Sequence, residues 1–241
     1  MTQTSSRKVI VSGYLGAGKS HLIARLADGG AVDAVEANAL EVPATAGSGD
    51  APVLVVVDGV NLTAVLDDPL VAPLVRAQIG AADAAFVSRG DVADVSAARA
   101  ALAHWPSLSV PESDEIDALV GVLADLSGSV RSGATPLDHS GDFATWSYSG
   151  SAVLTDTTLD EFLASRPKGA YRIFGKVRGP SKGIDIQVFG RGRQTAPVAQ
   201  PKESTLTAIG PALRFRPSEM DLAFSTAVVA ASYGRGIIAC R

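Results

Sequence analysis

The chain is poor in several residue types that would direct it to particular classes of protein. Its 241 residues include one cysteine, Cys240, which excludes an intramolecular disulfide and a cysteine-rich zinc site. Aromatic residues make up 5% of the chain, and no apolar run approaches the ~18 residues of a membrane-spanning helix. The first residues, MTQTSSRKVIVSG, contain no apolar segment of the secretory type. We therefore expect a cytoplasmic globular protein without a membrane partner.

Charge is distributed unevenly along the chain. The formal net charge is −4, but residues 1–130 contain 7 Lys/Arg against 16 Asp/Glu, whereas residues 131–241 contain 14 against 9. This difference fits two domains whose surfaces carry opposite charge. The basic half lacks a recognisable nucleic-acid-binding motif and the whole chain is acidic, so we expect no nucleic-acid partner.

The first half alternates between strand-like and helix-like segments. The strand-like segments are apolar throughout, as in parallel strands buried on both faces: KVIVSGY, APVLVVVDG and DAAFVSRGD. Helix-like segments lie between and after them: KSHLIARLAD, PLVAPLVRAQIGAA (delayed by Pro73), VSAARAALAHW and SDEIDALVGVLADL. This order predicts an α/β domain over residues 1–128, with a parallel sheet covered by helices on both faces.

A different pattern follows a Ser/Gly-rich stretch, residues 129–141, that we interpret as a linker. Residues 142–241 contain mostly strand-like segments: FATWSYSG, AYRIFGKVRG, GIDIQVFGRG and STLTAIG. One early helix, TLDEFLASRP, and one final helix, SEMDLAFSTAVVAAS, accompany them. We expect a small α+β domain here.

The segment GYLGAGKS, residues 13–20, fits the phosphate-loop pattern G-x-x-x-x-G-K-[ST]. A buried strand precedes it and an amphipathic helix follows it, as the pattern requires. Its small residues allow backbone N–H groups to curl around a phosphate: Gly13, Gly16, Ala17 and Gly18. Lys19 adds a positive charge for the phosphates, and the hydroxyl of Ser20 can ligate Mg²⁺. The sequence therefore predicts a P-loop NTPase-like domain that binds a nucleoside triphosphate.

Two further requirements are a carboxylate near the Mg²⁺ and a loop that reads the base. Glu36, at the end of VDAVE, and Asp58, at the end of VLVVVD, compete for the first role, and either also fits a solvated strand-end acid. For the base, SRGD at residues 88–91 follows an apolar strand, and Asp91 could accept two hydrogen bonds from guanine.

Taken in order, these segments resemble the CobW-type metallochaperone GTPases. SGYLGAGKS is similar to that family's TGFLGSGKT, VEANALEVP to IETTGLADP, and QIGAADAAFVSRGDV to QIxxADxIxLNKxDL. In the second half, FLASRPKGAYRIFGKVRG and TLTAIGPAL resemble the family's C-terminal domain. The resemblance implies binding of GTP or GDP with Mg²⁺, held by Ser20 and Glu36, and places Ser88, Arg89 and Asp91 at the base. It also implies a role in zinc or cobalt homeostasis with a client metalloprotein as partner.

The chain departs from this family in ways that bear on activity. The segment between Ser20 and Glu36 is short and lacks the family's switch and its C-x-C-C metal motif, and Ala39 stands where the family has Gly. The histidines form no recognisable zinc spacing: His21, His104 and His139. We therefore expect a slow or degenerate GTPase. The alternative is a non-catalytic interaction protein with a vestigial nucleotide site, and a kinase-like phosphotransferase would need an acceptor site and a lid that the sequence does not indicate.

Overall fold

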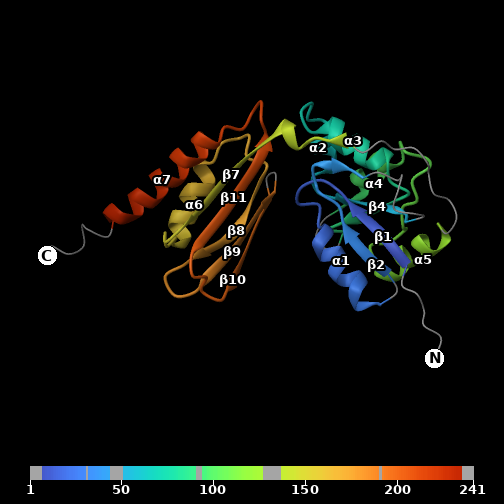
Figure 1. Cartoon of the computed structure of the whole chain (residues 1–241), viewed down its shortest axis with the longest axis horizontal. Coiled ribbons are helices and arrows are strands. Elements are labelled where there is room, and N and C mark those ends of the chain that lie inside the picture. The colour runs from blue at the N-terminus through green and yellow to red at the C-terminus, as the bar shows by residue number, and fades with distance from the viewer. Residues whose placement is uncertain are drawn as a thin grey trace. The chain divides into compact units, whose positions relative to one another are not determined.

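The computed structural model describes residues 7–30, 32–43, 51–90, 94–126, 137–189 and 192–234, without the side chains of 137 and 230–234. The chain forms two compact units, Met1–Ser140 and Gly141–Arg241. Each unit carries its own sheet and its own helices (Figure 1). Most of the stretch that we interpreted as a linker, up to residue 136, lies outside the described residues.

The first unit is built on a four-stranded parallel sheet in the order β2-β1-β4-β5. Its strands are β1 (Arg7–Ser12), β2 (Val32–Glu36), β4 (Val53–Asp58) and β5 (Ala84–Ser88). Beside these four strands, Ser109 in the segment SLSV forms one parallel bridge with Ala84. Because all four strands run the same way, their carboxyl ends meet at one edge of the sheet.

Helices cover both faces of this sheet, which confirms the α/β prediction. They are α1 (Lys19–Asp28), α2 (Leu62–Leu66), α3 (Ala72–Gly80), α4 (Ser96–Leu102) and α5 (Ile116–Asp125). On one face, α1 and α5 share a core with β1, β4 and β5, into which Leu22 and Leu123 insert. The residues of β4 from Val53 to Val57 are all buried, so the opposite face is covered as well, and the buried apolar residues of α2, α3 and α4 account for that layer.

One helix start agrees with the sequence pattern and one differs from it. As expected, Pro73 delays α3, which begins at Ala72 with the proline in its first turn. Helix α5, the last helix of the first unit, starts after Glu115 and not at Ser113, whose hydroxyl accepts the N–H of Glu115 instead. Outside the main sheet, a two-residue strand β3 (Glu41–Val42) pairs antiparallel with β6 (Leu137–Asp138), and a 3-10 turn, η1 (Ser140–Asp142), follows.

The second unit is a five-stranded antiparallel sheet in the order β10-β9-β8-β11-β7, with two helices on one face (Figure 1). Its elements are β7 (Phe143–Gly150), α6 (Asp156–Ser165), β8 (Arg172–Arg178), β9 (Gly183–Phe189), β10 (Gly192–Val198), β11 (Ser204–Pro211) and α7 (Pro217–Gly234). The core under α6 and α7 is rich in aromatic rings: Trp146, Phe162 and Phe224 are buried in it. The predicted α+β class is therefore confirmed.

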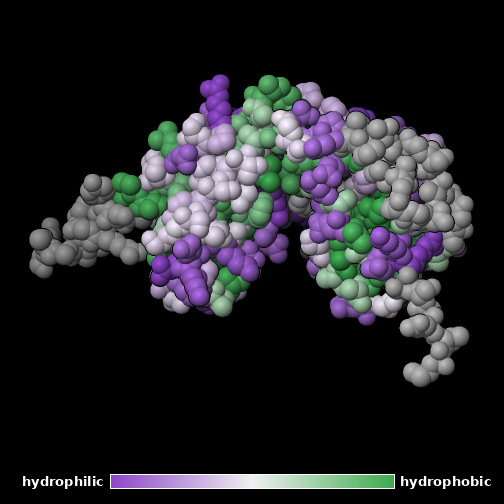
Figure 2. All heavy atoms as spheres, in the orientation of Figure 1, coloured by the Kyte–Doolittle hydropathy of each residue, from purple (hydrophilic) through white to green (hydrophobic). Residues whose placement is uncertain are grey.

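On the face shown in Figure 2, hydrophilic and hydrophobic residues are mixed over the described part of each unit. The large hydrophobic side chains that are exposed in the described residues are few: Val35, Val60, Leu213, Leu222 and Val229. Within the described ranges, every helix is too short or too polar to cross a bilayer.

Candidate functional site

The loop between β1 and α1 takes a path that its glycines make possible. Gly13 has φ 140°, and a Cβ atom on it would lie 2.3 Å from the carbonyl oxygen of Val56. Gly16 and Gly18 also have positive φ, at 78° and 98°. A side chain at Gly13 would collide with β4, so the loop passes close to that strand only because glycine stands there.

The helix that follows begins without a side-chain cap. Gly18 is the residue that precedes α1, and its left-handed conformation turns the chain into the helix. The first turn of α1 contains no acidic residue, and Lys19 is its first residue. The N–H groups of a first helical turn have no partners within the helix, and together with the helix dipole they favour an anion.

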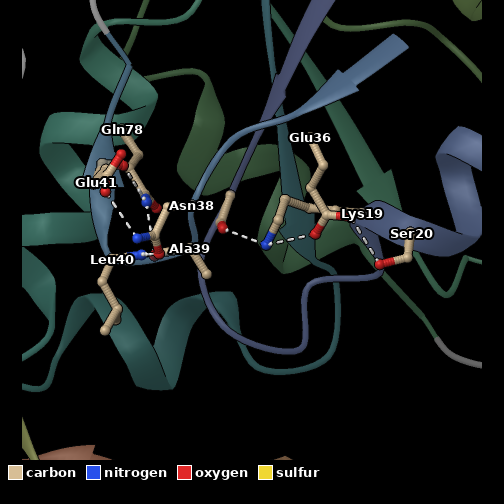
Figure 3. A network of polar contacts seen from close by, with 9 residues as sticks. Lys19, Ser20, Glu36, Asn38, Ala39, Leu40, Glu41 and Gln78 are labelled. Atoms are coloured by element: carbon tan, nitrogen blue, oxygen red, sulfur yellow. Dashed lines mark hydrogen bonds and ion pairs between the residues drawn. The ribbon is translucent and has the colours of Figure 1, made fainter. Parts of the chain in front are cut away.

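Lys19, Ser20 and Glu36 converge at the start of α1 (Figure 3). The Nζ of Lys19, whose side chain is 7% exposed, donates to the carbonyl oxygen of Gly13 at 2.9 Å and lies 3.7 Å from Oε1 of Glu36. The hydroxyl of Ser20 donates to Oε2 of Glu36 at 3.0 Å. A buried cation, a hydroxyl and a carboxylate therefore meet beside the phosphate-loop backbone.

The structure separates the two carboxylates that the sequence left in competition. Asp58 lies on the other side of β1 and is already engaged: its Oδ2 is 3.3 Å from Nη1 of Arg89 and accepts a hydrogen bond from Asn61 at 2.8 Å. Its Oδ1 accepts the backbone N–H of Val60. Glu36 is the one that lies with Ser20.

The donor set at Ser20 and Glu36 suits Mg²⁺. Magnesium prefers oxygen ligands in an octahedron at 2.0–2.1 Å, which places neighbouring ligand atoms about 2.9 Å apart. The two side-chain oxygens lie 3.0 Å apart, joined by a hydrogen bond, so they could serve as neighbouring ligands once the hydroxyl proton of Ser20 turns away from Glu36. The residues present therefore fit the ion.

The predicted base-reading segment begins where β5 ends, next to the phosphate loop. A Cβ on Gly18 would lie 3.4 Å from Cβ of Ser88, and the hydroxyl of Ser88 donates to the carbonyl oxygen of Val57 at 3.2 Å. Arg89 has φ 67°, a left-handed conformation that no other non-glycine residue adopts in the described part of the chain. Its Nη2 lies 3.3 Å from the carbonyl oxygen of Gly16. Asp91 lies outside the described residues.

The chain after Glu36 forms a hydrogen-bonded turn, and Gln78 on α3 donates further hydrogen bonds to it (Figure 3). The side chain of Asn38 accepts the N–H of Leu40 at 3.1 Å and donates to Oε1 of Glu41 at 2.8 Å. Nε2 of Gln78, on α3, donates to the carbonyl oxygens of Ala39 and Glu41 at 3.0 and 2.9 Å. Sequence reasoning assigned Gln78 no role; the available signal was a polar residue on an apolar helix face.

Among the described residues, no histidine side chain enters the contacts that join Lys19, Ser20 and Glu36. His21 is exposed on α1, and His104 is exposed beyond α4, with Nδ1 3.0 Å from the carbonyl oxygen of Ala101. His139 follows β6, and its N–H donates to the carbonyl oxygen of Leu40. Cys240 lies outside the described residues. Within the described ranges, no three His, Asp, Glu or Cys side chains gather as a metal-binding group.

Comparison with known proteins adds a single structural likeness. No protein-family model matches the sequence, and no curated protein matches it either. The crystal structure of the Zn(II)-bound YjiA GTPase from E. coli aligns with 92% of this chain and 98% of its own, at 14% sequence identity and a TM-score of 0.35. A TM-score this low supports no inference about the ligand or activity of this chain, which are argued from its own residues.

Proposed function

We propose that this protein binds guanine nucleotide together with Mg²⁺ at the Gly13–Ser20 loop, as a slow or degenerate GTPase of the CobW type. The observation that carries the proposal is the convergence of Lys19, Ser20 and Glu36 beside the uncapped start of α1. A cation and the N–H groups of a first helical turn suit phosphate, while a neighbouring hydroxyl and carboxylate suit the ion that accompanies it.

In this proposal each group has one task. The loop N–H groups and Lys19 hold the phosphates, and Ser20 and Glu36 hold the Mg²⁺, which neutralises phosphate charge when bound. Arg89 lies against the loop through the carbonyl oxygen of Gly16, and its stem would pack on the base. Ser88 and Asp91 would complete the base site, with Asp91 selecting guanine.

Slow turnover follows from the short connection between α1 and β2. Phosphoryl transfer depends on groups that position the attacking water and stabilise charge on the terminal phosphate. In this chain only residues 29–31 connect α1 to β2, so the connection cannot supply a covering segment. The proposed role in zinc or cobalt homeostasis, with a client metalloprotein, rests on the sequence resemblance alone, and a deletion strain grown under zinc starvation tests it.

Calorimetric titration with GDP and GTP in the presence of Mg²⁺ tests nucleotide binding. Wild-type protein should bind with a Kd well below ~1 mM, which corresponds to about −4 kcal/mol. Lys19→Ala should weaken binding by about 1.5–3 kcal/mol, the range for a hydrogen bond to a charged group. Lys8→Ala, on the exposed side of β1, is the matched control and should bind as wild type does. No binding by wild type at ~1 mM would overturn the proposal.

One observation favours the second candidate, a non-catalytic interaction protein with a vestigial nucleotide site. Glu36 already pairs with Lys19 and accepts from Ser20, so side chains of the chain itself satisfy the polar groups of the loop. A loop of this kind could keep its shape without a ligand. Under this candidate Lys19→Ala leaves biological activity intact, whereas under the first the same variant abolishes it.

A further inference from the structure

We infer that Gln78 is a positioning residue for the Mg²⁺ side of the site: it fixes the segment from Asn38 to Glu41 and thereby holds Glu36 against Ser20. The inference rests on the proposed function, because it assigns the segment's rigidity to metal-assisted nucleotide binding. It concerns a residue that lies in none of the loops expected to touch the ligand.

The burial of Gln78 is the first reason. It lies on the inner face of α3 among buried apolar residues such as Leu74 and Ile79, and it is 0% exposed. Removing a side-chain amide from water is unfavourable unless its hydrogen bonds are replaced. The Nε2 group has two hydrogens, and both are used, one on the carbonyl oxygen of Ala39 and one on that of Glu41.

The orientation of the amide is determined by its neighbours. Exchanging Oε1 and Nε2 would place an oxygen against two carbonyl oxygens, so only the donating orientation is favourable. In that orientation Oε1 is buried and has no hydrogen-bond partner among the described residues. A leucine of similar size would avoid this unsatisfied acceptor. The contribution of Gln78 therefore lies in its two bonds to the segment after Glu36.

These bonds act on a segment that is already held at both ends. On one side, Glu36 pairs with Val11 of β1, and the N–H of Ala37 donates to the carbonyl oxygen of Val11 at 2.8 Å. On the other side, Glu41 pairs with Asp138 of β6. Gln78 adds two bonds from α3, one to Ala39 between these ends and one to Glu41 itself (Figure 3).

The two bonds from Gln78 should affect nucleotide affinity only when Mg²⁺ is present. A carboxylate repels phosphate, so Glu36 favours nucleotide binding only through the ion that it shares with Ser20. If Gln78 is removed, the pairing of Glu36 with β1 remains, but the segment after it loses two bonds, so the carboxylate of Glu36 is held less firmly against Ser20. Lys19 and the loop backbone stay in place. Groups that orient a metal ligand typically contribute 10- to 100-fold to metal affinity.

The test compares GDP affinity in Mg²⁺ with GDP affinity in EDTA, measured by calorimetry for wild type and for Gln78→Leu. The gain from Mg²⁺ is the ratio of GDP affinity in Mg²⁺ to GDP affinity in EDTA. We expect this ratio to fall by about 10-fold in Gln78→Leu, while affinity in EDTA stays the same. Gln78→Asn, whose side chain is one methylene too short to reach both carbonyls, should behave in the same way and serves if the leucine variant fails to fold. Ile79→Val, its buried neighbour on α3, is the control and should keep the full gain.

Hydrogen exchange of the backbone amides of residues 37–42 supplies a second measurement that needs no nucleotide. Exchange should be faster in Gln78→Leu than in wild type and unchanged in Ile79→Val. Wild-type protein that binds no guanine nucleotide would overturn the proposed function. Wild-type protein that binds it, with a Gln78→Leu variant that keeps both slow exchange and the full Mg²⁺ gain, would overturn the role of Gln78 alone.

Discussion

Oε1 of Glu36 lies 3.7 Å from the ammonium group of Lys19, the same group that would hold phosphate in the proposed site. Lys19 is almost fully buried, whereas the Glu36 side chain is 43% exposed, so the carboxylate is the partner that can move. An incoming phosphate would therefore meet a cation that is already neutralised, and it would lie beside a negative charge unless a metal ion is bound between them.

The first prediction concerns Glu36→Gln. Without Mg²⁺ this variant should bind GDP more tightly than wild type by roughly 5-fold, because it removes a repulsion of the ~1 kcal/mol that two unit charges 4 Å apart have in water. With Mg²⁺ it should bind more weakly, because a metal ligand is lost. Titrations in EDTA and in Mg²⁺ measure both effects. Asp33→Asn, an exposed change on the same strand, is the control, and equal affinities for Glu36→Gln and wild type in both buffers would contradict the prediction.

The second prediction uses two glycines with opposite surroundings. Gly13→Ala should lower the free energy of unfolding by about 1–3 kcal/mol, because the residue has φ 140° and its new Cβ would lie 2.3 Å from the carbonyl oxygen of Val56. Gly121→Ala should raise it by about 0.5–1 kcal/mol, because Gly121 lies within α5 and a Cβ there meets no atom within 4 Å. Urea denaturation measures both changes. The same sign for the two variants would argue against this loop path.

The third prediction tests the link between the ends of β4 and β5. Arg89 and Asp58 are only 22% and 13% exposed, and they are 3.3 Å apart, so their pairing should contribute to stability. A double-mutant cycle with Arg89→Ala and Asp58→Asn should give a coupling of about 1 kcal/mol in the free energy of unfolding. Effects that simply add would show that the two side chains act independently.

The fourth prediction concerns the aromatic core of the second unit. Phe162 is 0% exposed, and its ring meets those of Trp146 and Phe224. Phe162→Ala should lower stability by about 3–5 kcal/mol because it leaves a cavity. With Trp105 changed to Phe, Trp146 is the remaining tryptophan, so its fluorescence during denaturation reports on this unit. Leu222→Ala, at a residue 68% exposed on α7, should stay within about 0.5 kcal/mol of the parent protein.

Local patterns in the sequence predicted much of the fold. The helix KSHLIARLAD is observed as α1 with the expected bounds, and the strand FATWSYSG as β7. Both segments have a clear hydrophobic periodicity, and residues at their boundaries end the helix or strand. In contrast, α2 has five residues and β10 is exposed for most of its length, so neither carries a hydrophobic period long enough to be recognised.

The candidate site was less accessible to sequence reasoning because its contacts are distant along the chain. Glu36 and Asp58 both end strands at the same sheet edge, and only the strand order places the first beside Ser20 and the second beside Arg89. Gln78 bonds to carbonyls that are 39 and 37 positions away, which no local pattern encodes. The assignment of guanine to Asp91 stays a prediction from sequence.

The short connection between α1 and β2 has a consequence for how such a protein would respond to nucleotide. Under the proposed function, with nothing in that connection to enclose a terminal phosphate, bound GTP would be hydrolysed slowly. Occupancy would then follow the prevailing concentrations of GTP and GDP. The protein would then respond to the ratio of GTP to GDP. In a protein with efficient turnover, by contrast, the GTP-bound state ends when the bound GTP is hydrolysed.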